Sequence, residues 1–163
     1  VGAAASQAIV DVSYGPKAIA LLKAGMAPAA ILKAIWDSDP DPEPKGWTKQ
    51  GRQFAVINQQ GEAATFTGPQ ATEWAGGTTG KFCTAQGNIL AGPEVVDAMA
   101  KAFEEAKGPL AWRLMAALRA GAAPRSDVSL SVRAAATEAP DRAALVADAT
   151  AKGFARVGGI HLV

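Results

Sequence analysis

The chain has 163 residues, the size of one domain, and hydrophobic residues make up 49% of it, which is enough to bury a core. Sixteen basic and fifteen acidic side chains leave a formal net charge of +1, and this balance argues against a nucleic-acid surface, which needs clustered Lys and Arg. One cysteine and one histidine exclude an internal disulfide and make a Cys- or His-based metal site improbable.

The sequence shows no feature of a membrane or secreted protein. No apolar run approaches the ~18 residues that cross a bilayer, and no charged segment precedes a hydrophobic one as in a signal peptide. These patterns predict a cytoplasmic protein without a membrane partner. The chain opens at Val1, inside a stretch that reads as a strand and without an initiating Met, so we expect further residues upstream.

The first part of the chain predicts a strand followed by two helices. Residues 1–10 are small and mostly apolar and predict a buried strand. Pro16 suits the start of a helix and Gly25 suits its end. A second helix is predicted from Pro28 to Trp36 because apolar residues recur there at helical spacing.

A loop and a hairpin are predicted next. Residues 37–45 contain three prolines and four acids, a composition typical of a loop. Residues 52–57 and 62–67 read as two strands joined by a polar turn at 58–61, which is the clearest hairpin signal in the chain. Residues 68–80 are rich in glycine and predict a further loop.

The segment from Phe82 to Pro93 is the most informative part of the sequence. It reads as a strand that runs into a tight polar turn at Gln86-Gly87-Asn88, followed by a helix that begins at Pro93. Gln86 and Asn88 carry uncharged amides, which can donate to a developing negative oxygen or hold a substrate amide without titrating.

The remaining sequence predicts alternating helices and short strands. The predicted elements are helices at 93–106 and 110–121, a strand at 128–132, a helix at 141–152 and a short strand at 160–163. This order fits a single α+β domain over residues 1–163 better than strict βαβ alternation.

Three blocks of sequence carry a resemblance to a known family. They are Gly2-Ala3-Ala4-Ala5-Ser6-Gln7 with Tyr14-Gly15-Pro16, then Arg52-Gln53 with Phe66-Thr67-Gly68 and Trp74-Ala75-Gly76, and finally Gln86-Gly87-Asn88-Ile89-Leu90-Ala91-Gly92-Pro93. In order and spacing they resemble DUF1028, a bacterial family of unknown function assigned to the N-terminal nucleophile (Ntn) hydrolase superfamily. The resemblance is strongest over residues 1–121.

The resemblance implies a fold and a chemistry. The fold is an Ntn-hydrolase-like four-layer αββα sandwich, here incomplete at the N-terminus. The chemistry is hydrolysis of an amide bond in a small molecule or peptide by a chain-terminal Thr, Ser or Cys whose α-amine serves as the base. This mechanism requires neither a metal nor an organic cofactor, so we expect none. Val1 has neither a hydroxyl nor a thiol, so we expect the nucleophile upstream of Val1.

Five residues are candidates for the site. Asn88 is the candidate oxyanion donor, and Gln86, Gln7 and Ser6 are candidates for lining the same cleft. These polar groups are equally suited to satisfying nearby backbone groups. Arg52 suits a substrate carboxylate, to which it can donate two hydrogen bonds, but a salt-bridged surface arginine fits the sequence as well.

Two other function classes stay open at this point. The first is a catalytically inactive binding or assembly module on the same fold, with homo-oligomerisation through an apolar helical face as one form of assembly. The second is a cysteine-dependent enzyme that uses Cys83. Neither a histidine nor a helix N-terminus stands beside Cys83 in the sequence to lower its pKa, so a buried structural cysteine is the favoured interpretation.

Overall fold

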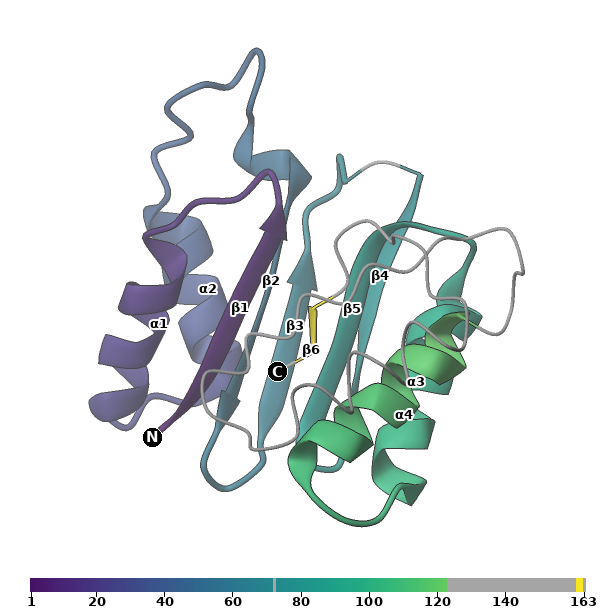
Figure 1. The fold of residues 1–163 in the computed structure, drawn as a ribbon. Coiled ribbons are helices and arrows are strands. Elements are labelled where there is room, and N and C mark those ends of the chain that lie inside the picture. The colour runs from purple at the N-terminus through teal and green to yellow at the C-terminus, as the bar shows by residue number, and fades with distance from the viewer. Residues whose placement is uncertain (72, 123–160, 163) are drawn as a thin grey trace, which may run out of the picture.

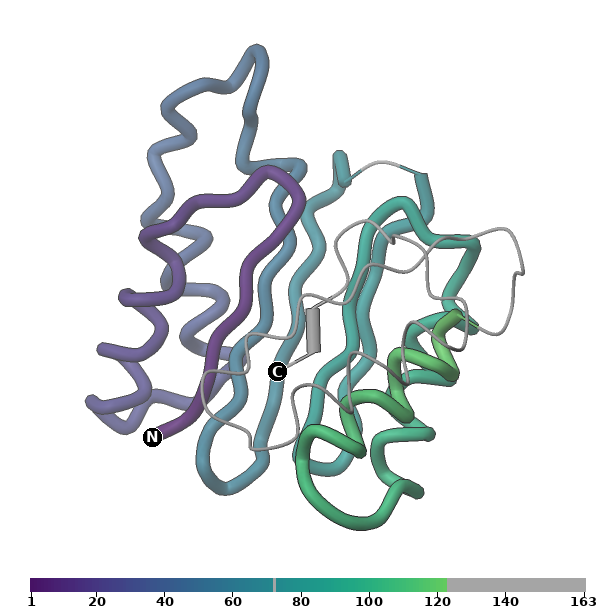
Figure 2. The backbone as a smooth tube through the Cα atoms, in the orientation of Figure 1, coloured from purple at the N-terminus to yellow at the C-terminus, as the bar shows by residue number. Residues whose placement is uncertain are grey.

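The computed structural model describes residues 1–71, 73–122 and 161–162. In these ranges the chain is mixed α+β, with four α-helices and two antiparallel three-stranded sheets. Figures 1 and 2 show the two sheets side by side at the centre of the molecule, with one pair of helices on either side.

The first sheet has the strand order β1-β2-β3. Its strands are β1 (Gly2–Ala8), β2 (Arg52–Asn58) and β3 (Ala63–Thr67). The helices α1 (Tyr14–Lys23) and α2 (Pro28–Ser38) pack on this sheet. A short 3-10 helix, Lys49–Gly51, leads into β2.

The second sheet has the strand order β4-β5-β6. Its strands are β4 (Trp74–Gly80), β5 (Cys83–Leu90) and the short β6 (His161–Leu162). The helices α3 (Pro93–Glu105) and α4 (Leu110–Ala122) follow β5, and α3 packs on both β4 and β5. The two sheets contact each other, chiefly through β3 with β4 and β2 with β5.

Each apolar core lies between a sheet and its own helices. The first contains Tyr14, Ala18, Leu22, Ile31, Leu32, Ile35, Phe54 and Val56. The second contains Cys83, Ala85, Val95, Val96, Met99, Ala100, Phe103 and Ala117. Successive residues of a strand point to opposite faces, so the residues between these core positions face the other sheet. The layer between the sheets is therefore lined mainly by amides, hydroxyls, alanines and glycines, with Ile57 toward one end of β2.

Most predicted elements are confirmed. The hairpin of β2 and β3 is confirmed, with Ala55 opposite Thr65, and residues 59–62 connect its strands. The helix ending at Gly25 is closed by hydrogen bonds from Gly25 N to Leu22 O (3.0 Å) and from Met26 N to Leu21 O (3.1 Å). Gly25 has φ +83°, which glycine adopts without strain.

Two predictions are wrong. The glycine-rich stretch predicted as a loop contains β4, because Thr78 and its neighbours pair with β5. The tight polar turn predicted at Gln86-Gly87-Asn88 is a continuous strand instead, with Gln86 paired to Gly77 on one side and to His161 on the other. The final short strand is confirmed by β6, whereas the strand and helix predicted at 128–132 and 141–152 lie outside the described residues.

Candidate functional site

Gln53 joins the two sheets. Its side chain is fully buried on β2 and faces the second sheet. The amide nitrogen of Gln53 donates to the carbonyl oxygens of Gly76 on β4 (3.1 Å) and Gly87 on β5 (2.9 Å), and to Oγ1 of Thr67 on β3 (2.8 Å). A buried polar side chain that bonds to two backbone carbonyls of another sheet fixes the spacing of the sheets at this point.

Gln7 extends this polar group along the first sheet. Gln7 lies directly opposite Gln53 in the register of β1 and β2, and its amide nitrogen donates to the Gln53 carbonyl oxygen. The carbonyl oxygen of the Gln7 side chain is buried and has no hydrogen-bond partner among the described residues. Burying an acceptor without a partner raises the free energy of the folded state, so this oxygen is available to accept a hydrogen bond from a bound molecule.

Gln86, on the opposite sheet, also has a buried side-chain atom to which no described residue forms a hydrogen bond. The carbonyl oxygen of Gln86 accepts from Oγ1 of Thr65 on β3 at 2.7 Å. The Gln86 amide nitrogen and the Thr84 hydroxyl are buried, and within the described part of the chain neither has a hydrogen-bond partner. The layer thus presents a free amide donor, a free amide acceptor and a free hydroxyl, all uncharged.

Gly77 allows the sheets to approach at Gln86. A Cβ atom at Gly77 would lie 2.6 Å from Oγ1 of Thr65 and 3.0 Å from Cβ of Gln86. Any larger residue would push these two side chains apart, so the glycine is required by the close contact.

Asn88 lies at a β-bulge. Trp74 pairs with Leu90 and Gly76 with Gly87, so β5 has one more residue than β4 in this interval. Ile89 within the bulge has φ +58°, a left-handed conformation that strains a β-branched residue. The Asn88 side chain is half-buried and makes no hydrogen bond to a described residue, and bulges of this kind re-aim side chains beside active sites.

Ser6 does not share the face of the other candidates. It pairs with Phe54, and both therefore lie on the helix-covered side of the first sheet, whereas Gln7 lies on the side that faces the second sheet. The expectation that Ser6 and Gln7 face the same cleft is thus wrong for adjacent residues of one strand.

Arg52 forms a buried ion-pair cluster at the end of β1 and β2. Its Nη1 atom donates to the carboxylates of Asp11 (2.8 Å) and Asp39, and the Tyr14 hydroxyl donates to the same Asp39 oxygen. The Arg52 guanidinium lies 5.3 Å from the centre of the Tyr14 ring. Arg52 is ion-paired as the sequence allowed, but it is buried rather than on the surface. Its role toward a substrate carboxylate stays a prediction.

The cluster shifts the protonation of two of its members. Burial, the hydrogen bond to Asp39 and the Asp39 charge raise the pKa of Tyr14 far above its ordinary value of 10.0. Burial also raises the pKa of Asp11, but hydrogen bonds from Ser13 and the Arg52 guanidinium outweigh it and hold that pKa below 3.8.

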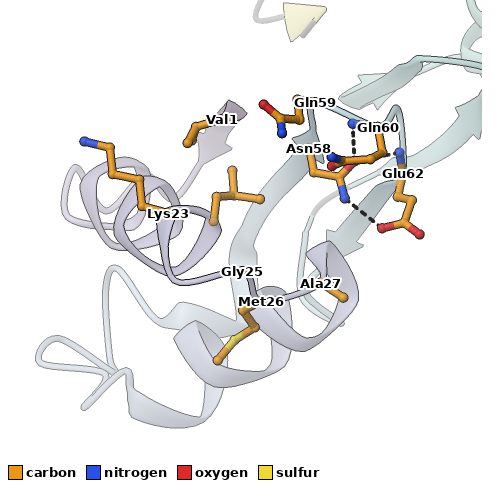
Figure 3. Close-up of a pocket in the computed structure, with 10 residues that line it drawn as sticks. Val1, Lys23, Gly25, Met26, Ala27, Asn58, Gln59, Gln60 and Glu62 are labelled. Atoms are coloured by element: carbon orange, nitrogen blue, oxygen red, sulfur yellow. Dashed lines mark hydrogen bonds between the residues drawn. The ribbon is translucent and has the colours of Figure 1, made fainter.

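Two surface pockets mark the two ends of β1. A pocket of about 470 Å³ lies at the Val1 end, between the last turn of α1 and the β2–β3 turn (Figure 3). Asn58 lines its polar side. The Asn58 amide nitrogen donates to Glu62 Oε2 at 2.7 Å, and the Asn58 carbonyl oxygen accepts from the backbone nitrogen of Gln60 at 3.0 Å. A second pocket of about 460 Å³ lies at the Arg52 end.

Cys83 has the environment of a structural cysteine. It faces the second apolar core and is fully buried. Burial, followed by the negative charge of Glu104, raises the pKa of the Cys83 thiol, which disfavours the reactive thiolate.

The structure brings together three of the five predicted site residues and adds others. Gln7, Gln86 and Asn88 lie on or beside the layer between the sheets, whereas Ser6 and Arg52 lie on strand positions that face the helices. Gln53, Thr65 and Thr84 also belong to this layer, although their sequence context did not mark them as candidates. The only available signal was their alternation with core residues along each strand.

Other site types are absent from the described ranges. No group of three His, Cys, Asp or Glu side chains that could hold a metal ion occurs there. Among the same residues, no helix has the length and apolar character needed to cross a membrane.

The fold and the site define an α+β protein with a polar layer between two antiparallel sheets. Residues 1–141 match DUF1028, a family of unknown function, and the chain belongs to that family. The crystal structure of protein SPO2555 from Silicibacter pomeroyi, described as a DUF1028 protein, is similar to it with a TM-score of 0.65 and 30% identity. The similarity covers 74% of this chain and 50% of SPO2555, so the chain spans about half that protein's length. No curated protein matches the chain.

Proposed function

We propose that this protein hydrolyses an amide bond in a small molecule or peptide by the Ntn mechanism, and that its layers are those of the four-layer αββα Ntn sandwich. The observation that carries the proposal is the set of vacant hydrogen-bonding atoms in the buried layer between the sheets. Gln7 offers a free carbonyl oxygen as an acceptor, Gln86 offers a free amide nitrogen as a donor, and Thr84 adds a hydroxyl. A substrate amide has one donor and one acceptor, so it complements these vacancies.

Asn88 is the proposed oxyanion donor. Its uncharged amide is half-buried, unused by the described residues and set off the regular strand alternation by the bulge. A fixed donor of this kind stabilises the negative oxygen of the tetrahedral intermediate without changing its own charge.

The nucleophile is proposed to lie on a segment that precedes Val1. Val1 is at the opposite end of β1 from Gln7, and a strand of this length separates them by about 20 Å. A residue joined directly to Val1 is therefore too far from Gln7 and Asn88. The preceding segment must run back along the sheet for about seven residues before a Thr, Ser or Cys reaches the site.

The proposal is tested on native protein purified from its source. Intact mass and N-terminal sequencing identify the first residue, and a panel of N-acyl amides and short peptides is assayed for amine release. We expect a leading Thr, Ser or Cys and turnover of at least one amide. A native chain that starts with another residue, or a native chain that leaves every amide intact, contradicts the proposal and favours a binding module on the same fold.

A further inference from the structure

The pocket at the Arg52 end, here called the Trp47 pocket, is built from the segment after β1 and the segment before β2. Its lining residues are Ala8, Ile9, Val10, Asp11, Val12, Pro42, Glu43, Trp47 and Arg52. Its volume of about 460 Å³ falls in the range of small-molecule sites.

Exposed apolar side chains gather at this pocket. Val10 is 54% exposed, Val12 84% and Trp47 63%, and all three belong to its lining. Apolar side chains left in water around one hollow indicate a surface that is covered by a ligand. The Trp47 ring provides the largest of these surfaces and is also a good partner for a cation.

The charges of the Trp47 pocket favour a cation over an anion. Its lining has two carboxylates, Asp11 and Glu43, and one guanidinium, Arg52. Arg52 forms ion pairs with Asp11 and with the buried Asp39, which is not part of the lining. Glu43 is exposed, and its carboxylate makes no hydrogen bond or ion pair with a described residue. Carboxylates therefore exceed the free positive charge at the pocket.

Neighbouring lysines do not reverse this balance. The ammonium group of Lys49 donates to the carbonyl oxygens of Trp36 (3.2 Å) and Asp39 (3.1 Å). Its charge is balanced by the nearby Asp41 carboxylate, whose pKa the hydrogen bond from the Lys49 backbone and this charge help to lower. Lys45 is exposed and does not line the pocket.

The Trp47 pocket lies at the end of β1 and β2 where Gln7 and Gln53 also lie. Its first lining residue, Ala8, directly follows Gln7, and Arg52 directly precedes Gln53. Gln7 and Gln53 are the two bonded amides of the layer between the sheets and face the second sheet, whereas Arg52 faces the helices, so a molecule bound in the layer reaches the pocket only with a side group that passes around the end of β1 and β2.

We propose that the Trp47 pocket binds a positively charged nitrogen on an apolar stem, such as the side chain of a lysine or arginine residue in a peptide. The stem packs on Val10, Val12 and Trp47, and the charged nitrogen lies by Glu43. The identification of this group as part of an amide substrate rests on the proposed function, whereas binding to the pocket does not.

The test is a titration of the full chain, followed by NMR, with three probes that share a backbone and carry a positive, a neutral or a negative side chain. They are the N-acetyl N-methylamides of lysine, norleucine and glutamate, and the reporter is the Trp47 indole N–H signal, assigned with Trp47→Phe. We expect the lysine probe to shift this signal and to bind about fivefold more tightly than norleucine, with glutamate weakest. Added salt is expected to weaken only the lysine probe appreciably.

Two variants test the contribution of charge. Glu43→Gln is expected to weaken the lysine probe about two- to fivefold and to leave norleucine unchanged. Glu62→Gln, at the opposite end of β1, is the matched control and is expected to change neither. Equal or tighter binding of norleucine or glutamate, or no shift of the Trp47 signal by the lysine probe, overturns the proposal.

The outcomes separate this inference from the proposed function. Binding of the lysine probe by a protein that cleaves no amide supports the pocket and contradicts the hydrolase. Amide cleavage with no preference for a lysine over a norleucine side chain supports the hydrolase and contradicts the identification of the group bound in the pocket as part of its substrate, while the titration alone decides whether the pocket binds that group.

Discussion

Gln7 on β1 donates a side-chain hydrogen bond to Gln53 on β2, and the two amides lie directly opposite each other in register. This bond connects the β1 edge of the first sheet to the residue that holds the second sheet, because Gln53 also donates to the backbone of Gly76 and Gly87. The layer between the sheets is therefore held by polar bonds, whereas the apolar cores lie outside it.

Replacement of Gln53 should destabilise the protein strongly. Gln53→Leu leaves the carbonyl oxygens of Gly76 and Gly87 and the amide of Gln7 without their partner, at a cost of about 1–3 kcal/mol for each buried group that stays unsatisfied. We expect the free energy of unfolding in urea to fall by about 3 kcal/mol or more. The exposed Gln59→Ala is the control and should change it by less than about 0.5 kcal/mol. An equally small effect of Gln53→Leu would show that these bonds do not hold the sheets.

The Arg52 ion pair should show strong coupling. Arg52→Met leaves the buried Asp39 carboxylate without its cation and should cost about 3–5 kcal/mol in urea denaturation. Adding Asp39→Asn removes the orphaned charge, so the double variant should lose less than the sum of the two single variants, by about 1–3 kcal/mol. Additive losses would mean that the two groups do not interact.

Tyr14 gives a direct readout of the same cluster because it is the only tyrosine in the chain. Burial and Asp39 raise its pKa, so the folded chain binds the phenol proton more tightly than the unfolded chain. This stabilisation is complete below the unfolded-state pKa of 10.0 and is lost as the pH rises through the higher folded-state pKa. We expect no tyrosinate absorbance near pH 10 in the folded protein and a normal titration in urea. Ionisation of the folded protein near pH 10 is the contrary result.

Ile89 should be replaceable with a gain in stability. Its left-handed backbone costs a β-branched residue about 1–2 kcal/mol, and 63% of its surface is exposed, so little packing is lost on replacement. Ile89→Asn should raise the free energy of unfolding by about 1 kcal/mol. Val12→Asn, also exposed but without a positive φ, is the matched control and should stay within about 0.5 kcal/mol of the parent. Destabilisation by Ile89→Asn would indicate that the Ile89 side chain matters more than its backbone.

The elements with a strong local pattern were predictable. The β2–β3 hairpin and the helices from Pro28 and Pro93 follow from alternation, helical spacing and terminal prolines, and the structure confirms them. β4 was missed because glycines at Gly76, Gly77 and Gly80 favour a loop locally. There the pairing with β5 and the close approach of Thr65 outweigh local preference.

The polar layer was only partly predictable. Gly87 and Asn88 are residues common in turns, and nothing local distinguishes a turn from a strand that carries a bulge. Gln53 alternates with core residues as a solvent-facing residue would. Only the second sheet, which covers that face, makes it buried.

The role of Asn88 is decided by comparing the rate of amide hydrolysis by the native protein with that of Asn88→Ala, on any substrate that the amide panel provides. If Asn88 donates to the oxyanion, kcat should fall about 10²–10³-fold while the folded state, followed by circular dichroism, is unchanged. The exposed Gln60→Ala is the control and should keep the parent kcat. An unchanged kcat in Asn88→Ala would contradict the assignment of the layer between the sheets as the catalytic site.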